Sequence, residues 1–261
     1  MKKSILLFVL FLSFSSTLLA STIGIIAALP AEIISLSKQE ITEGQFIKTN
    51  ISNHKVVMTL SGVGKVNAAM TAQKLISEYK VDLIIFSGVT GALNETYNIG
   101  DIIIADKVFQ YDYGFLGADD NLVIHKPGFM PELGLGTGSE SLFYNMHDVK
   151  NWDNILISLK TIQFDKINNY EPRLITGTVA TGDQFVSSAT KKKELVAIGA
   201  DAVEMEGGAV AQVASANNVP CIIIRSISDK ANHDASVDFV TFVKVAALNN
   251  SAIVKTILEK L

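Results

Sequence analysis

The chain has 261 residues, of which 48% are hydrophobic and 18% are charged, so it can bury a sizeable apolar core. This composition excludes an intrinsically disordered chain, and a single cysteine, Cys221, excludes a scaffold held together by disulfides. A formal net charge of −4 argues against a nucleic-acid partner, and the four scattered histidines form no metal-binding motif. We therefore expect a globular protein with no metal site.

The first twenty residues have the layout of a secretory signal peptide. Lys2 and Lys3 precede an apolar stretch of about ten residues, and the small residues Ala20 and Ser21 follow it. A membrane span needs roughly 20 apolar residues, and no cysteine lies nearby for lipid attachment. An uncleaved anchor and a buried first strand are the alternatives. We predict cleavage near Ala20, export to the periplasm, the surface or the medium, and a mature domain, residues 21–261, without a transmembrane segment.

From residue 22 onward, short apolar runs alternate with helical patterns, which predicts a layered α/β domain. The expected strands are Ile23–Leu29, Val56–Leu60, Leu83–Phe86, Ile102–Ala105, Leu174–Val179 and Cys221–Ile227. The expected helices are Pro30–Lys38, Val66–Tyr79, Ser139–Leu159, Ala189–Ile198, Glu206–Asn217 and Val237–Leu261. Several strands are continuously apolar, as is typical of strands covered on both faces. We predict a three-layer α/β/α sandwich around a twisted, mixed but largely parallel sheet. Asp112–Gly138 is expected to be a long irregular loop with a functional role.

Acidic residues follow the predicted strands at the edge where open α/β sheets bind ligands. Glu32 follows the first strand, Glu204 and Glu206 precede a helix, and Asp229 follows the last strand. Taken singly, each is explained as a helix-start acid or a turn residue. Together they suit cleavage of a glycosidic bond, in which one acid protonates the leaving group and another carboxylate stabilises the cationic sugar or activates water.

Three other motifs have plainer interpretations. Gly62–Lys65 lacks the spacing of a phosphate-binding loop or of a dinucleotide fingerprint. Gly88–Gly91 is interpreted as a tight turn between a strand and a helix. The run Lys191–Lys193 is interpreted as a solvated helix face rather than as a site for polyanions.

The order and spacing of these motifs resemble the 5′-methylthioadenosine/S-adenosylhomocysteine nucleosidases, in the purine nucleoside phosphorylase superfamily. The segments that carry the resemblance are Ile23–Glu32, Ser61–Val66, Gly100–Ile102, Thr181–Phe185, Val203–Glu206 and Arg225–Asp229. The resemblance covers residues 22–261 and implies a nucleoside phosphorylase-like fold without a cofactor. It also implies hydrolysis of methylthioadenosine, S-adenosylhomocysteine and 5′-deoxyadenosine, by a homodimer in which the neighbouring subunit closes the 5′ pocket.

The resemblance further implies a role for each site residue. Asp229 is the general acid for adenine N7, Glu206 binds the ribose hydroxyls, and Glu32 activates water. Arg225 is expected to hold Glu32 or the water. The remaining substrate-binding residues are Glu204 on a ribose hydroxyl, Met205 on the sugar, Phe185 on adenine, the Val186 backbone on the purine edge, Ser228 supporting Asp229, and Leu29, Val63 and Phe239 around the 5′-alkylthio group.

One position departs from the family pattern, because Val89 stands where a serine is usual. Thr90 or Ser87 is a candidate to replace that hydroxyl. A phosphorylase on the same fold is the close rival, but phosphate is usually held by arginines, and the chain has only Arg173 and Arg225. A hydrolase for futalosine or AMP, and an exported non-catalytic protein that binds nucleosides or polyanions, are further alternatives.

Overall fold

The computed structural model describes residues 21–137, 140–146, 148–167 and 169–261, and the predicted signal peptide lies outside these residues. The strands are β1 (Thr22–Ala27), β2 (Phe46–Ile51), β3 (His54–Leu60), β4 (Leu83–Ala92), β5 (Ile102–Gln110), β6 (Gly114–Leu116), β7 (Leu122–Ile124), β8 (Tyr144–Asn145), β9 (Leu174–Thr181), β10 (Ala202–Glu204) and β11 (Cys221–Asp229). The helices are η1 (Pro30–Glu32), α1 (Ile34–Ser37), α2 (Lys65–Tyr79), η2 (Pro131–Leu133), α3 (Trp152–Leu159), α4 (Ala189–Ala197), α5 (Gly207–Ala216) and α6 (Ala235–Lys260), where η marks a 3₁₀ turn.

The central sheet is mixed but largely parallel, as predicted. Strand β1 pairs in parallel with β3 and β4, and β4 continues in parallel to β11. Strands β5, β9 and β10 are also mutually parallel, and β5 joins β11 in the antiparallel direction. A short antiparallel pairing between β10 and β4 closes β4, β11, β5, β9 and β10 into a ring. Because of this closure, Gly91 of β4 lies opposite both Val203 and Asp229.

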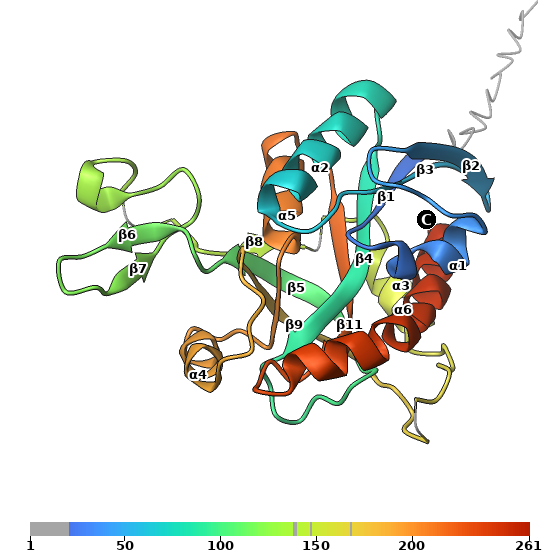
Figure 1. Cartoon of the computed structure of the whole chain (residues 1–261). Helices are drawn as coiled ribbons and strands as arrows, with labels where there is room; N and C mark the ends of the chain where they lie inside the picture. Colours follow the sequence, from blue (N-terminus) through green and yellow to red (C-terminus); the bar gives the residue numbers. More distant parts are fainter. Residues whose placement is uncertain (1–20, 138–139, 147, 168) are drawn as a thin grey trace, which may run out of the picture.

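Helices cover the sheet on both faces (Figure 1). On one face, Ile26 and Phe86 pack with Ala72 of α2 and Val210 of α5. On the other face, a second core includes residues of β1, α1, α3 and α6. Neighbouring β1 residues thus belong to opposite cores, which explains why the strand is apolar on both faces. The three-layer α/β/α prediction is confirmed.

Four parts of the chain differ from the sequence prediction. Among the described residues of the predicted helix Ser139–Leu159, only α3 is helical, because Asn151 has a left-handed backbone (φ 65°) directly before it and β8 occupies part of the preceding segment. The loop Asp112–Gly138 contains the hairpin β6–β7, which projects from the body of the molecule (Figure 1). Strands β2 and β10 were missed. Strand β4 continues through the glycines that were predicted to form a turn.

The predicted final helix corresponds to α6, whose bounds are Ala235–Lys260. Over the described part of the chain, no single helix is long and apolar enough to cross a membrane. Helix α6 consists of two parts, Ala235–Lys244 and Leu248–Lys260, with an angle of 55° between them. Only when these parts are counted together is the helix long and apolar enough, by length and composition alone, to span a membrane. Helix α6 packs mainly on β11 and β4, two of the strands that contribute residues to the site described next.

Candidate active site

A cavity of about 390 Å³ lies at the carboxyl ends of β1, β4, β10 and β11, which is the edge predicted from sequence. Its volume falls in the range of small-molecule sites. Every residue predicted for the site lines this cavity except Arg225. The structure therefore brings together segments that are far apart in the chain. Lining residues that the prediction did not name are Ala28, Gly91, Gln184 and Val203.

Glu32 is fixed by the turn that follows β1. Pro30 begins the 3₁₀ turn η1, which points the Glu32 carboxylate back toward the end of the strand. Its Oε2 accepts hydrogen bonds from the backbone N–H groups of Ala28 (2.8 Å) and Leu29 (2.7 Å), and its Oε1 accepts one from Val89 (3.0 Å). Burial raises the pKa of the Glu32 carboxyl above its usual value, although Arg225 and the three N–H donors act in the opposite direction.

Asp229 ends β11, where a register shift follows Ile227. The Ser228 hydroxyl donates to Asp229 Oδ2 (2.9 Å), and the Ala231 N–H donates to Oδ1 (2.9 Å). Burial raises the pKa of this carboxyl despite these two donors, which favours the protonated form that a general acid needs. Ser228 thus lies where the resemblance placed it, beside Asp229.

Glu206 lies at the start of α5, and its Oε1 accepts a hydrogen bond from the Gly64 N–H (3.0 Å). Burial, and then the neighbouring Glu204 carboxylate, raise the pKa of Glu206 to about 8. Gly64 belongs to the loop after β3, so this bond connects two distant segments across the cavity. The carboxyl group is therefore poised to change protonation state when a cationic or hydroxyl-bearing ligand enters.

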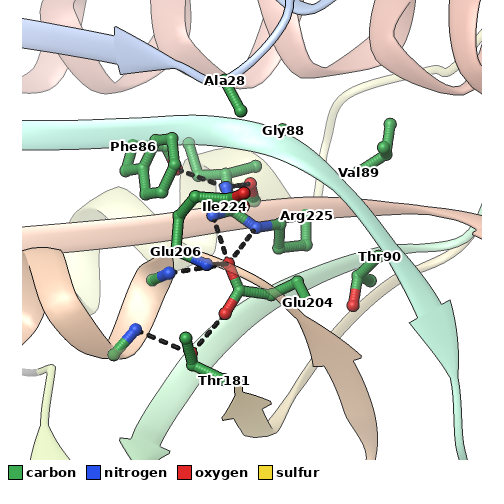
Figure 2. Close-up of polar contacts among 12 residues, drawn as sticks. Ala28, Phe86, Gly88, Val89, Thr90, Thr181, Glu204, Glu206, Ile224 and Arg225 are labelled. Atoms are coloured by element: carbon green, nitrogen blue, oxygen red, sulfur yellow. Dashed lines mark hydrogen bonds and ion pairs between the residues drawn. The ribbon is translucent and has the colours of Figure 1, made fainter. Parts of the chain in front are cut away.

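Arg225 is not hydrogen-bonded to Glu32, one of its two predicted partners, because it donates to Glu204 and to the Phe86 and Ile224 carbonyls. A contact with the attacking water stays a prediction. Arg225 Nη2 and Nε donate to Glu204 Oε2 at 2.7 and 3.2 Å (Figure 2). The same carboxylate accepts from the Thr181 hydroxyl and from the N–H groups of Glu206 and Gly207. Two carboxylates lie near Arg225, and sequence could not determine which of them it binds. The ribose contact of Glu204 stays a prediction.

Two glycines of β4 leave room for the acidic groups. A Cβ atom on Gly88 would lie 2.9 Å from both Arg225 Nη1 and Glu32 Oε1, and one on Gly91 would lie 2.7 Å from Asp229 Oδ1. Contacts this short require neighbouring atoms to move. The glycines therefore allow three side chains, one from η1 and two from β11, to converge on the strand.

We expect Gly88→Ala to lower turnover by about tenfold to 100-fold, because it displaces Glu32 or Arg225 by a fraction of an ångström or more. Steady-state turnover and a thermal melt on the same preparation would check this. Unchanged turnover in a folded variant would show that the Glu32 position is not critical.

The two residues proposed to replace the missing serine are not placed alike relative to the cavity. Val89 packs against Phe239 and Val243 of α6, which makes this wall apolar. The Thr90 hydroxyl donates to the Val203 carbonyl (2.7 Å), so its proton is already used. Ser87 is buried and does not line the cavity. The Thr90 oxygen can still accept a hydrogen bond, so the predicted contact of Thr90 with substrate or water stays a prediction.

The outer rim of the cavity is aromatic and apolar. Phe185 and Phe239 meet edge to face, with ring centroids 5.6 Å apart, and Phe185 is 46% exposed. Val63 lies on the rim and is also exposed, whereas Val186 is buried. An apolar rim of this kind suits a planar base or an alkylthio group.

A charged cluster that the prediction missed ties three loops together near the site. The Lys65 ammonium forms an ion pair with Asp112, the Asp183 N–H donates to Asp112 Oδ2 (2.8 Å), and the Lys65 N–H donates to Asp183 Oδ1 (2.8 Å). Lys65 directly follows Gly64, the donor to Glu206, and Asp183 precedes Phe185 in sequence. The cluster therefore fixes, relative to each other, the two loops that carry Val63 and Phe185 to the cavity.

The run Lys191–Lys193 does not form a patch of three free ammonium groups. Lys191 pairs with Glu194, while Lys192 is buried, binds Glu95 (2.9 Å) and donates to the Lys230 carbonyl (2.8 Å). The prediction of a fully solvated face was therefore wrong at Lys192. This pairing removes most of the support for a polyanion-binding site.

The fold and this acidic cavity define an enzyme of the nucleoside phosphorylase class. The family model of the phosphorylase superfamily matches residues 22–259, and the chain belongs to that superfamily. The nucleoside phosphorylase-like fold is thereby confirmed.

Three relatives show what the chain is similar to. The 5′-methylthioadenosine/S-adenosylhomocysteine nucleosidase of Mycobacterium tuberculosis is 33% identical over 257 residues, which cover 93% of this chain and 99% of that protein. The aminodeoxyfutalosine nucleosidase of Campylobacter jejuni is 33% identical over 247 residues, covering 92% and 99%. The crystal structure of the Helicobacter pylori 5′-methylthioadenosine/S-adenosylhomocysteine nucleosidase with butyl-thio-DADMe-Immucillin-A superposes with a TM-score of 0.75, at 28% identity over 93% of this chain and 100% of that one.

Proposed function

We propose that the protein hydrolyses the N-glycosidic bond of 5′-methylthioadenosine, S-adenosylhomocysteine and 5′-deoxyadenosine, releasing adenine and the 5′-substituted ribose. The observation that carries this proposal is the convergence of Glu32, Glu206 and Asp229 on one cavity of nucleoside size. The named nucleosidases among the relatives support it.

In the proposed reaction Asp229 donates its proton to N7 of adenine as the bond between C1′ and N9 breaks. The base then leaves as neutral adenine, and the sugar passes through an oxocarbenium-like state. Glu206 binds the ribose hydroxyls, and the positive charge that develops on the sugar favours its ionised form. Phe185 packs on the base, and the backbone of Val186 binds the purine edge.

Glu32 completes the reaction by accepting a proton from the attacking water. The water oxygen forms the new bond to C1′, and its second hydrogen stays on the product as the anomeric hydroxyl. Three backbone N–H groups hold the Glu32 carboxylate, so the base is fixed before substrate arrives. Arg225 supports this arrangement indirectly, because it fixes Glu204, which lines the cavity.

Water is a better nucleophile than phosphate for this cavity. Among its described lining residues there is no lysine or arginine to hold a phosphate dianion. Arg225 is neutralised by Glu204 at 2.7 Å, and Arg173 is paired with Asp101 at 2.7 Å. The carboxylate of Glu32 would also repel an anion. Phosphorolysis is therefore disfavoured electrostatically.

Aminodeoxyfutalosine is a second candidate substrate, since the Campylobacter jejuni relative is named for it. Leu29, Val63 and Phe239 surround the expected position of the 5′ group, and the exposure of Val63 leaves that end accessible to a larger substituent.

The deciding experiment measures adenine release by residues 21–261 from each nucleoside, with and without phosphate. Release that needs no phosphate, with a free 5′-substituted ribose as co-product, supports the proposal, whereas strict dependence on phosphate overturns it.

We also propose that the enzyme is a homodimer that uses the outer face of α2. Val66 and Met70 are one helical turn apart and are 69% and 63% exposed, and Val63 continues this apolar face to the cavity rim. Such a continuous patch beside a site is typical of an interface. The second subunit would cover the open 5′ end.

Changing both Val66 and Met70 to Glu should produce monomers and raise KM several-fold, because like charges would meet across the proposed interface and the 5′ end would stay open. Sedimentation velocity and steady-state kinetics would check this. Val196→Glu, on the exposed surface of α4, is the matched control. A double variant that sediments like the wild type would argue against this interface.

Export through residues 1–20 is a further proposal, resting on the layout of that segment alone. The enzyme would then act on nucleosides outside the cytoplasm. N-terminal sequencing of the protein isolated from its own cells would locate the first residue of the mature chain. A chain that keeps residues 1–20 would contradict cleavage.

A further inference from the structure

Helix α6 carries a buried amide that reaches both central strands of the site. The Ser226 hydroxyl of β11 donates to Asn250 Oδ1 (2.7 Å), and Asn250 Nδ2 donates to the Gly88 carbonyl of β4 (2.8 Å). Both Asn250 and Ser226 have no exposed surface. A buried polar pair of this kind is costly unless it is hydrogen-bonded, as it is here.

The Gly88 carbonyl belongs to the same peptide group as the Val89 N–H. That N–H donates to Glu32 Oε1 at 3.0 Å. In a trans peptide the carbonyl and the N–H point in opposite directions, so the hydrogen bonds form a chain from Ser226 through Asn250 and the peptide to Glu32. A hydrogen bond to a carbonyl polarises the peptide and strengthens its N–H as a donor.

We propose that Asn250 is a positioning residue that orients and polarises the Gly88–Val89 peptide for the Glu32 carboxylate. The inference rests on the proposed function, in which Glu32 activates water. Ser226 assists by holding the Asn250 amide with its nitrogen toward Gly88. Helix α6 thereby contributes a dipole to the site through the backbone of β4, without Asn250 itself lining the cavity.

Charged groups from the other elements also act on Glu32. Arg225 of β11 lowers the pKa of Glu32, and the Glu32 carboxylate in turn raises the pKa of Glu206. Asp229 lines the same cavity, and Asp238 of α6 acts on Asp229 by raising its pKa. Asn250 differs from all of these because it carries no charge and acts through one hydrogen bond. Its removal should therefore affect the ionised form of Glu32 selectively.

Asn249 provides a matched control on the same helix. It is also buried, and it exchanges two hydrogen bonds with the backbone of Asp165, Oδ1 accepting at 2.9 Å and Nδ2 donating at 3.1 Å. Asn249→Leu and Asn250→Leu thus remove the same side-chain groups from the same helix. Both should lower the melting temperature, but only Asn250→Leu disconnects the peptide that binds Glu32.

In Asn250→Leu we expect turnover to fall about three- to tenfold, and the acidic limb of the pH profile to move up by about 0.5 to 1 pH unit. The direction follows because a weaker donor stabilises the Glu32 carboxylate less and so raises its pKa. Ser226→Ala, a smaller change, should move the limb in the same direction by less. Asn249→Leu should leave the limb in place.

An Asn250→Leu profile that matches the Asn249→Leu profile overturns the inference. If Asn250→Leu does not fold, the pH profile of Ser226→Ala is compared with that of Asn249→Leu instead, and identical profiles overturn the inference. The titration of the Glu32 carboxyl by ¹³C NMR, assigned with Glu32→Gln, measures the same shift without turnover. If the wild type releases no adenine, the proposed function fails, while this titration still tests whether Asn250 acts on Glu32.

Discussion

Asp229→Asn is expected to lower adenine release by about 100- to 10,000-fold, the usual contribution of a general acid. An amide cannot supply a proton to N7 of adenine, so the base would have to leave as an anion. The substitution should be well tolerated structurally. The Oδ1 of the introduced asparagine can still accept a hydrogen bond from the Ala231 N–H. Its Nδ2 can donate to the Ser228 hydroxyl, which can turn to donate to the Thr90 carbonyl 3.3 Å away.

Single-turnover release of adenine and equilibrium binding of adenine should be measured together on this variant. We expect binding to be largely retained, because the loss concerns proton transfer rather than the shape of the cavity. Asp234→Asn is a suitable control, since Asp234 is an exposed carboxylate a few residues away that does not line the cavity. Turnover near that of the wild type would overturn the assignment of Asp229 as general acid.

The location of the three acids was predictable from sequence, because each adjoins an apolar strand or opens a helix. Continuous apolar runs identify strands covered on both faces, and the carboxyl ends of parallel strands lie at one edge. Glu32 and Asp229 could be placed on this basis before any contact was known. The same reasoning correctly gave the layered, largely parallel sheet.

The partners of the buried polar groups were not predictable in the same way. Arg225 was placed near the acids, but its choice of Glu204 over Glu32 depends on side-chain directions set by three strands. The contact of Asn250 with Gly88 joins residues 162 positions apart. The pairing of β10 with β4, which closes the ring, involves only two residue pairs and leaves no periodic signal. Such features arise from tertiary packing rather than from local pattern.

Glu32→Gln is expected to reduce hydrolysis by a similar factor of about 100 to 10,000, because the amide cannot accept a proton from water. Three N–H groups surround the Glu32 carboxylate, so either orientation of the amide places its NH₂ group against an N–H donor. When the glutamine oxygen faces the Ala28 and Leu29 N–H groups, only the hydrogen bond from the Val89 N–H is lost. The variant should therefore fold and still bind nucleosides, which separates loss of chemistry from loss of the site.

The wild-type pH profile adds a second criterion for the Glu32 assignment. The pKa of Glu32 is raised by burial, and Glu32 must be ionised to act as a base, so activity should fall as the pH decreases through this raised pKa.

The stability of the fold should change with pH in the opposite direction. Raised carboxyl pKa values at Glu32, Asp229 and, at about 8, Glu206 stabilise the fold at acidic pH, and this stability is lost as the pH rises through them.

Glu32→Gln removes one of these ionisations, so its melting temperature should fall less steeply than that of the wild type as the pH is raised. Thermal melts across the pH range would measure the difference between the two slopes. Normal activity in Glu32→Gln would show that water is activated elsewhere in the cavity. Inactivity with an unchanged slope would show that the pKa of Glu32 is not raised in the folded protein.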